Sequence, residues 1–262
     1  MTANPPALQL YTLREQMTGD RAGVLAQVAA FGYGAVEPFG ILADPAGLRA
    51  DLDAVGLAVS SVHAAPFGDQ AEAIAGAART LGADTVIVPY QDPARFADAD
   101  GVRALARELN EAAAWGAGHG LRVGYHNHDF ELSSLIGGVT ALEVLAGQLD
   151  DAVLLEVDTY WAAVGGQDVP ALLGRLGDRV RYLHVKDGPV VSREDFMTAV
   201  GSGRMPVAEI LAASPSAQWH VVELDRCATD MLTAVGDSLA WLASHGLAEP
   251  VKHQAAGRQG GA

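Results

Sequence analysis

The sequence predicts a single (β/α)8 barrel, because eight strand-like segments alternate with helix-like segments over about 250 residues. The helix-like segments are rich in alanine and leucine, and glycines follow several of them where a left-handed residue commonly ends a helix: Gly32, Gly56, Gly82, Gly120 and Gly246. A doubly wound open sheet uses the same alternation. However, no Gly-x-Gly-x-x-Gly motif follows the first strand, and polar strand ends are spread around the units instead of meeting at one switch point. We therefore expect the barrel.

Each element follows from its local pattern. The expected strands are Ala7–Leu13, Ala35–Phe39, Val59–Ala65, Thr85–Tyr90, Arg122–His128, Val153–Tyr160, Val180–Lys186 and Trp219–Asp225. The expected helices are Arg21–Phe31, Pro45–Val55, Gln70–Leu81, Gly101–His119, Val139–Leu149, Val169–Leu176, Val207–Ala213 and Asp230–His245. Residues 1–249 should form one barrel domain, and residues 250–262, which lack apolar periodicity, should form a flexible tail.

Composition excludes several classes of function. The chain has 32 acidic and 17 basic residues and a formal net charge of −15, which argues against binding nucleic acid. No apolar run approaches the roughly 20 residues that cross a bilayer, and the N-terminus lacks the pattern of a secretory signal. Cys227 is the only cysteine, so no internal disulfide forms. We expect a cytoplasmic protein that binds neither nucleic acid nor a membrane.

The segment Gly124-Tyr-His-Asn-His-Asp-Phe-Glu131 places two histidines and two carboxylates within eight residues. It continues the expected strand Arg122–His128, and successive side chains of a strand point to opposite faces. His126 and His128 should therefore share one face. Two imidazoles side by side, with carboxylates nearby, suit a divalent metal.

Three later strands also end in polar residues. The same alternation turns one set of side chains toward the barrel axis: Glu156, Asp158, His184, Lys186, Glu223 and Asp225. In the second and third strands, Glu37, Ser61 and His63 occupy equivalent positions. Catalytic residues of such barrels come from the carboxyl ends of several strands. Burying so many ionisable groups without partners costs several kcal/mol each, so they must pair or bind a metal.

A purely structural interpretation is the alternative. Glu156 or Asp187 could each pair with an arginine, such as Arg179, Arg181 or Arg204. Because four separate strands agree, we favour one divalent metal ion, and mixed histidine and carboxylate ligands suit Mn²⁺, Zn²⁺, Co²⁺, Fe²⁺ or Mg²⁺. The loop Gly201-Ser-Gly-Arg-Met-Pro206 is interpreted as a flexible rim loop in preference to a phosphate-binding nest, and Cys227 as inert.

At these residues the chain resembles the sugar phosphate isomerase/epimerase superfamily, the xylose-isomerase-like TIM barrels that also include endonuclease IV. The resemblance extends from Leu8 to Arg226. Its most specific elements are Tyr125-His-Asn-His-Asp-Phe-Glu131, Asp158-Thr-Tyr-Trp161, His184-Val-Lys-Asp187 and Val222-Glu-Leu-Asp225.

The resemblance implies a metal held by Asp158, His184 and Glu223, with a fourth ligand from the fifth strand. Relatives often have glutamate at that fourth position, where this chain has His126. The glutamates of the fifth and eighth strands ligate the metal and form the acid/base pair in the isomerases and epimerases. Losing one removes a proton-transfer group, for which Glu131 or Lys186 could substitute, unless the reaction differs.

The activity implied by the resemblance is that of a metal-dependent isomerase or epimerase acting on a carbohydrate or polyol. Glu223 would remove the proton α to a carbonyl, Lys186 would stabilise the oxyanion or act as acid, and four residues would contact substrate: Glu37, His63, His128 and Trp161. The alternatives are a lyase, dehydratase or hydratase on keto-inositols or 3-keto-sugars, a DNA-repair endonuclease, which the net charge opposes, and a non-catalytic sugar-binding barrel. Homo-oligomers are common among such barrels.

Overall fold

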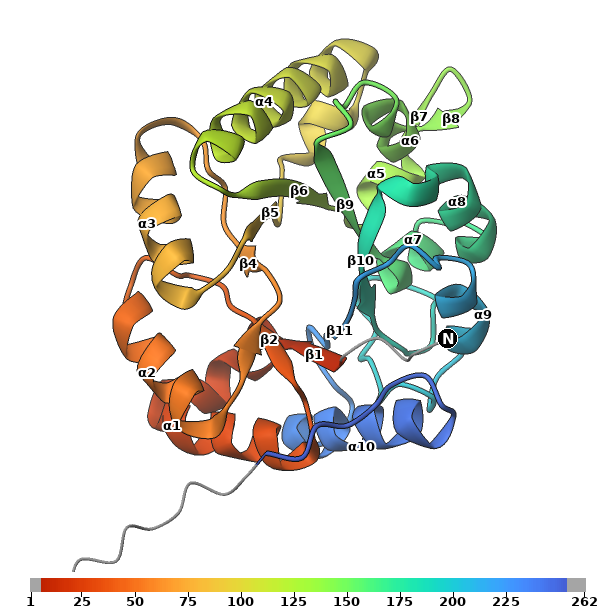
Figure 1. The fold of residues 1–262 in the computed structure, drawn as a ribbon. Helices are drawn as coiled ribbons and strands as arrows, with labels where there is room; N and C mark the ends of the chain where they lie inside the picture. Colours follow the sequence, from red (N-terminus) through yellow and green to blue (C-terminus); the bar gives the residue numbers. More distant parts are fainter. Residues whose placement is uncertain (1–5, 254–262) are drawn as a thin grey trace, which may run out of the picture.

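The computed structural model describes residues 6–253. Its centre is a nine-stranded parallel sheet in the order β3-β2-β1-β11-β10-β9-β6-β5-β4. The strands are β1 (Pro6–Gln9), β2 (Ala35–Glu37), β3 (Ala58–Val59), β4 (Val62–His63), β5 (Thr85–Val88), β6 (Arg122–His126), β9 (Val153–Asp158), β10 (Val180–Val185) and β11 (Trp219–Val222). The terminal members of this order, β3 and β4, are two pieces of the third expected strand. The sheet therefore closes on itself, as Figure 1 shows in a view down its axis.

Helices surround this barrel (Figure 1). They are α1 (Arg14–Phe31), α2 (Pro45–Val55), α3 (Ala71–Leu81), α4 (Ala99–Gly118), α5 (Phe130–Ser133), α6 (Ala141–Ala146), α7 (Thr159–Val164), α8 (Val169–Leu176), α9 (Val207–Ala212) and α10 (Met231–Ser244). The predicted (β/α)8 barrel is thus confirmed. No helix within residues 6–253 is long and apolar enough to cross a membrane.

The helices that match the prediction carry clear start and stop signals. The Asp44 carboxylate accepts the N–H of Gly47 at the start of α2, and Pro45 stands in the first turn. Asp168 caps α8 in the same way, through the N–H of Ala171. Gly56 ends α2 with φ +74°, which a residue with a side chain rarely adopts. Both helices therefore have the bounds that the sequence predicts.

The segment before α6 differs from the expectation of one helix over Val139–Leu149. Gly137 and Gly138 both have positive φ and form the turn of a small hairpin, in which β7 (Leu135–Ile136) pairs with β8 (Val139–Thr140). Thr140 then caps α6 by accepting the N–H of Glu143. Because of the glycine pair and the cap, α6 begins two residues later than predicted.

The expected strands are longer than the observed ones at their carboxyl ends. β1 stops at Gln9, after which Leu10–Leu13 form a 3-10 helix, and β11 stops at Val222. After β1 and after β11 the chain leaves the sheet, and Tyr11, Glu223 and Asp225 in these segments line the cavity at the mouth of the barrel.

The barrel interior changes in character along its axis. Toward the amino ends of the strands it is filled by small apolar side chains, Ala7, Ala35 and Val221, with Trp219 packed against them. Toward the carboxyl ends it is filled by buried histidines and carboxylates. The core that stabilises the fold therefore lies at one end of the barrel and between the sheet and the helices, and the ionisable groups gather at the other end.

The beginning of the expected tail contacts the barrel. The N–H of Val251 donates to the carbonyl of Gly32 over 2.8 Å, and His253 Nε2 lies 2.6 Å from the carbonyl oxygen of Tyr33. Residues 254–262, where most of the tail was expected, lie outside the described residues.

Candidate active site

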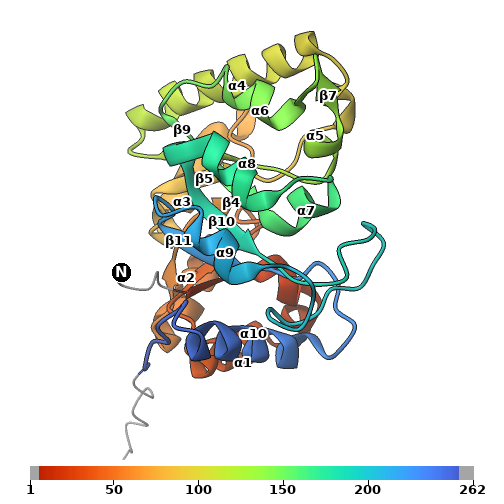
Figure 2. The ribbon, with the colours of Figure 1, turned by 90° about the vertical axis from the view of Figure 1, so that its right-hand side faces the viewer.

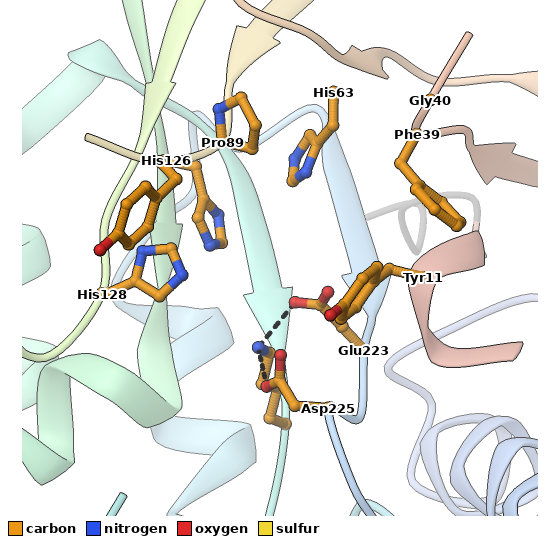
Figure 3. Close-up of a pocket in the computed structure, with 11 residues that line it drawn as sticks. Tyr11, Phe39, Gly40, His63, Pro89, His126, His128, Glu223 and Asp225 are labelled. Atoms are coloured by element: carbon orange, nitrogen blue, oxygen red, sulfur yellow. Dashed lines mark hydrogen bonds and ion pairs between the residues drawn. The ribbon is translucent and has the colours of Figure 1, made fainter. Parts of the chain in front are cut away.

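A cavity of about 380 Å³ opens at the carboxyl ends of the strands. Figure 3 shows its walls, with Tyr11 and Phe39 on the side away from His128. The lining residues combine an aromatic mouth with an ionisable floor: Tyr11, Phe39, Gly40, His63, Pro89, Tyr90, His126, His128, Lys186, Glu223 and Asp225. This combination suits a polar ligand with apolar faces.

Lys186 is the centre of a buried charge cluster at the floor. Its ammonium nitrogen lies 2.6 Å from Glu223 Oε2, 2.7 Å from Asp225 Oδ2 and 2.8 Å from Asp158 Oδ2. Lys186 is almost completely buried, and so are Asp158 and Glu223. One cation therefore faces three carboxylates, which leaves the cluster with a surplus of negative charge.

His126 and His184 lie beside this cluster, with their ring centroids 4.5 Å apart. His184 Nδ1 lies 2.7 Å from Glu223 Oε2, and His126 Nε2 lies 3.8 Å from Asp158 Oδ2. One ligand atom from each of these four residues lies within 4.8 Å of the others. This set of four residues is called the upper quartet below.

A second layer lies deeper in the barrel. Glu156 Oε2 is 2.7 Å from His63 Nε2 and 3.1 Å from His126 Nδ1, and Glu37 Oε2 is 2.7 Å from His184 Nε2. Glu37 also accepts hydrogen bonds from Gln9 and from Ser61. Both glutamates are fully buried. The inward faces of β1, β2, β4 and β9 therefore meet beneath the imidazoles of His126 and His184, which contact both layers.

The carboxylates respond differently to this environment. Burial would raise the pKa of Glu223, but Lys186 and His184 hold it well below its usual range. Burial likewise opposes ionisation of Glu156, yet the nearby imidazoles lower its pKa to about 2. At Asp158 burial dominates and raises the pKa to about 6 in spite of Lys186. Glu223 is therefore an ionised carboxylate at neutral pH, beside the cavity.

The histidines divide into two kinds. Burial and the positive charge of His184 hold the pKa of His126 well below its ordinary value, and burial with Lys186 lowers the pKa of His128 to about 3. At His63, Glu37 and Glu156 outweigh burial and raise the pKa to about 10. His126 and His128 are thus neutral at physiological pH, and a neutral imidazole has a free lone pair for a metal or a hydrogen bond.

The donor set fits a divalent metal. Two imidazoles and two carboxylates form a mixed nitrogen and oxygen site of the kind that Zn²⁺ or Mn²⁺ accepts. The surplus negative charge around Lys186 would be offset by such an ion. Each imidazole also has a carboxylate on its other nitrogen, as histidines that ligate metals commonly do.

The structure brings most of the residues singled out from the sequence to this cavity. His63, His126, His128, Lys186 and Glu223 line it, and Asp158 and His184 lie directly beneath them. Two others that were expected to contact substrate lie behind the lining. Glu37 belongs to the deeper layer, and Trp161 is buried on α7, with Lys186 Nζ 5.4 Å from its ring centroid.

Sequence reasoning gave Glu156 too small a role. The alternative in which it pairs with an arginine is wrong, because its oxygen contacts His63, His126 and His184. The signal was its position two residues before Asp158 on the same face of β9. The aromatic residues of the mouth, Tyr11 and Tyr90, gave no such signal, because Tyr11 lies in the 3-10 helix after β1 and Tyr90 in the loop after β5.

Asp187 does not pair with an arginine either. Its carboxylate accepts the backbone N–H groups of Gly188, Gly201, Gly203 and Met205. The glycine-rich loop therefore does form a nest of amide donors, but a carboxylate of the chain itself fills that nest. This arrangement ties both ends of the long loop after β10, which projects from the carboxyl end of the barrel in Figure 2, to one buried side chain.

Glu131 lies outside the cavity and so does not replace a proton-transfer group there. It is fully buried, accepts the Tyr125 hydroxyl over 2.7 Å and accepts the N–H of His128 over 2.9 Å. Tyr125 alternates with His126 on β6 and points away from the barrel axis. Of the two candidate substitutes, only Lys186 reaches the cavity.

Comparison with solved structures agrees with this architecture. A sugar phosphate isomerase/epimerase from Parabacteroides distasonis superposes with a TM-score of 0.81 at 22% identity, over 95% of this chain and 96% of that one. The IOLI protein, solved with a binding zinc atom, superposes with a TM-score of 0.68 at 13% identity, over 93% and 98% of the two chains. At these identities the likeness shows the fold alone.

Sequence comparison adds a curated relative and a family. The inosose dehydratase of Mesomycoplasma hyopneumoniae (strain 7448) is 30% identical over 122 residues, which are 46% of this chain and only 37% of that relative's length. The model of the xylose isomerase-like TIM barrel family matches residues 25–245, which include every member of the upper quartet. The protein therefore belongs to the xylose isomerase-like TIM barrel family.

Proposed function

We propose that this protein is a metal-dependent isomerase that removes the proton α to the carbonyl of a keto- or aldo-polyol. The observation that carries the proposal is Glu223, an ionised carboxylate at the cavity floor that also belongs to the upper quartet. His126, Asp158, His184 and Glu223 would hold the metal. A divalent ion bound there would polarise the substrate carbonyl and stabilise the negative charge that develops on its oxygen.

The chain's own residues supply the proton transfer. Glu223 is the base, because it is ionised and lines the cavity. Lys186 lies 2.6 Å from the same carboxylate and stays protonated, since its three carboxylate neighbours raise its pKa well above the usual range in spite of burial. Its ammonium group would hydrogen-bond a developing oxyanion, and His128 would hydrogen-bond a substrate hydroxyl.

The distribution of carboxylates favours isomerisation over epimerisation. Within residues 6–253, the carboxylates that line the cavity are Glu223 and Asp225, which both follow β11. In the closed sheet order β5 lies across the barrel from β11, and the chain after β5 presents Pro89 and Tyr90. A single base on one side can move a proton between neighbouring carbons on the same face of an enediolate. Inverting a stereocentre needs a second group on the opposite face, and that wall carries no carboxylate.

The same charges indicate an unphosphorylated substrate. Among the described residues that line the cavity, Lys186 is the one lysine or arginine, and three carboxylates already surround it. A phosphate group needs free cations or a row of amide donors. The glycine loop that offers such donors gives them to Asp187. We therefore propose a neutral polyol as the substrate.

A dehydratase is the second candidate, favoured by the similarity to inosose dehydratase. Elimination begins with the same removal of the α-proton by Glu223. It then ends with loss of the β-hydroxyl as water, to which Lys186 would donate a proton. A neutral cyclic ketone such as a keto-inositol suits the same pocket, whose lysine is already paired with carboxylates and is not free to bind a phosphate.

The proposal is tested by incubating the protein, loaded with Zn²⁺ or Mn²⁺, with a panel of neutral keto- and aldo-polyols in D2O. Isomerisation conserves substrate mass apart from deuterium incorporated at carbon, and elimination loses water. The variant Glu223→Gln should lower deuterium incorporation by about 100-fold or more, the usual contribution of a general base. Glu209→Gln, an exposed site on α9, is the matched control. A wild-type protein that binds metal but exchanges no proton with any member of the panel would refute the proposal.

A further inference from the structure

The upper quartet and the deeper layer share two imidazoles but contact opposite nitrogens of each ring. His126 presents Nε2 to Asp158 and Nδ1 to Glu156. His184 presents Nδ1 to Glu223 and Nε2 to Glu37. An imidazole that binds a metal has lost the proton of the bound nitrogen and keeps the N–H of the other. The partner of one nitrogen therefore decides whether the other nitrogen can bind a metal.

The deeper glutamates are well placed to fix that choice. Glu156 and Glu37 are fully buried, and each lies within hydrogen-bond distance of a ring nitrogen: 3.1 Å to His126 Nδ1 and 2.7 Å to His184 Nε2. His63 Nε2 lies 2.7 Å from Glu156 and 3.1 Å from Glu37, so one imidazole bridges the two carboxylates. Ser61 and Gln9 donate further hydrogen bonds to Glu37.

We propose that Glu156 and Glu37 are positioning residues, which accept the Nδ1–H of His126 and the Nε2–H of His184 and so turn His126 Nε2 and His184 Nδ1 toward the metal. This inference rests on the proposed metal-dependent function. It assigns to two buried carboxylates the task of setting the tautomer and the ring orientation of both histidine ligands. Such outer partners commonly change metal affinity by 10- to 100-fold.

The deeper layer also contains a set of residues that could itself hold an ion: His63, His126, Glu156 and His184. Two observations favour the upper quartet. Glu156 Oε2 already lies within 3.2 Å of all three imidazoles, and Glu37 occupies a further side of His63 and His184. The carboxylate that the upper quartet adds, Glu223, lines the cavity where a substrate oxygen can arrive, whereas Glu156 of the deeper set does not. Binding at both places at once would require each shared ring to lose both of its N–H protons.

The test uses the full chain, with Zn²⁺ alone as the probe. Zinc dissociation constants are measured by competition with a chelator for the wild type, Glu156→Ala, Glu156→Gln and Glu37→Gln. Nitrogen-15 NMR of histidine-labelled, zinc-loaded wild type identifies the metal-bound nitrogen of each ring. The control is Glu131→Gln, which alters an equally buried carboxylate that contacts neither His126 nor His184.

We expect zinc on Nε2 of His126 and on Nδ1 of His184. Zinc affinity should fall 10- to 100-fold in Glu156→Ala and less in the glutamine variants, whose amide oxygen still accepts a hydrogen bond. Glu131→Gln should bind zinc as the wild type does. The inference is overturned by zinc on the opposite nitrogens, or by folded variants whose affinities all lie within twofold of the wild type.

The experiment can tell a failure of the positioning role from a failure of the proposed activity for two reasons. The nitrogen assignment needs no variant, so a substitution that prevents folding does not decide the question. Both readouts are made without substrate. A wild type that shows the expected nitrogens and yet converts no polyol would therefore refute the proposed function and support the positioning role.

Discussion

Single residues at the floor of this barrel are held by charge, and most of their side chains are buried. Lys186 illustrates the balance, since one buried ammonium contacts Asp158, Glu223 and Asp225. Removing Lys186 would leave the three carboxylates without their shared cation, and breaking a buried ion pair in this way commonly costs about 3–5 kcal/mol. Neighbouring carboxylates have opposite pKa shifts because burial prevails at Asp158, whereas Lys186 and His184 outweigh burial at Glu223.

Glu131 is another buried carboxylate whose ionisation affects stability. Burial raises its pKa to about 7, in spite of the Tyr125 hydroxyl and the His128 N–H. The unfolded chain releases this proton near pH 4.5, so the folded state binds more protons between pH 4.5 and 7, and the free energy of unfolding falls as pH rises through that window. The loss amounts to about 3 kcal/mol at most, since each unit of pKa shift is worth about 1.4 kcal/mol.

Glu131→Gln should flatten this part of the stability profile, because glutamine does not ionise. Urea unfolding of wild type and variant between pH 4.5 and 8 measures the difference in slope. Comparing the two proteins cancels the groups that titrate in both, His63 among them. Parallel profiles would contradict the buried, protonated state of Glu131.

Among the elements, the loop between β10 and α9 is organised by one side chain. Asp187 accepts four backbone N–H groups from its two ends. Within the same loop Val190 adopts a positive φ of 55°, which is strained for a β-branched residue, and Val191 and Phe196 are exposed. The loop holds this conformation because its base is fixed, and it lies beside the mouth of the cavity.

Gly203→Ala should release this loop. A Cβ at Gly203 would overlap the Asp187 carboxylate and the backbone nitrogen of Gly188, so the hydrogen-bonded base would have to open. We expect a destabilisation of about 1–3 kcal/mol and faster proteolytic cleavage between residues 188 and 205. Limited proteolysis followed by mass spectrometry locates the cut.

The control for this experiment is Gly174→Ala. Gly174 lies on α8, and a Cβ there meets no atom within 4 Å. Alanine at this helical position should be neutral or slightly stabilising. An unchanged cleavage pattern in Gly203→Ala would show that Asp187 does not hold the loop.

For the molecule as a whole, metal binding should be linked to stability, because the upper quartet is assembled from β6, β9, β10 and the chain after β11. Strands that far apart in sequence converge only in the folded chain, so an ion bound there stabilises the folded state alone. A metal at 100 times its dissociation constant contributes about 2.7 kcal/mol. For a domain of this size that corresponds to a rise in Tm of about 5–10 °C.

Differential scanning calorimetry with and without Zn²⁺ or Mn²⁺ measures this rise. Asp158→Ala removes one quartet carboxylate and should abolish it. A wild-type Tm that does not respond to any divalent ion, or an equal response in Asp158→Ala, would contradict the assignment of the quartet.

Local patterns along the chain are enough to predict the barrel and the inward face of each strand. The alternation of Leu155, Glu156, Val157 and Asp158 needs only the period-two geometry of a strand, and the βα repeat needs only local propensity and helix caps. The alternation therefore predicts that His126, Asp158, His184 and Glu223 point inward, and the resemblance to the sugar phosphate isomerase/epimerase superfamily singles these four out as ligand candidates. The extra hairpin before α6 was missed because a glycine pair and a threonine cap interrupt a segment whose composition is otherwise helical.

Which inward residues meet, and through which atoms, depends on how the barrel closes. Closure of the barrel brings Glu156 of β9 against His63 of β4, residues 93 positions apart, and places its carboxylate beside three imidazoles instead of an arginine. It also places Asp187 in the nest of the glycine loop and Glu131 behind β6, outside the cavity. Pattern along the chain fixes the direction of a side chain, whereas its contacts depend on distances between strands that only the closed barrel sets.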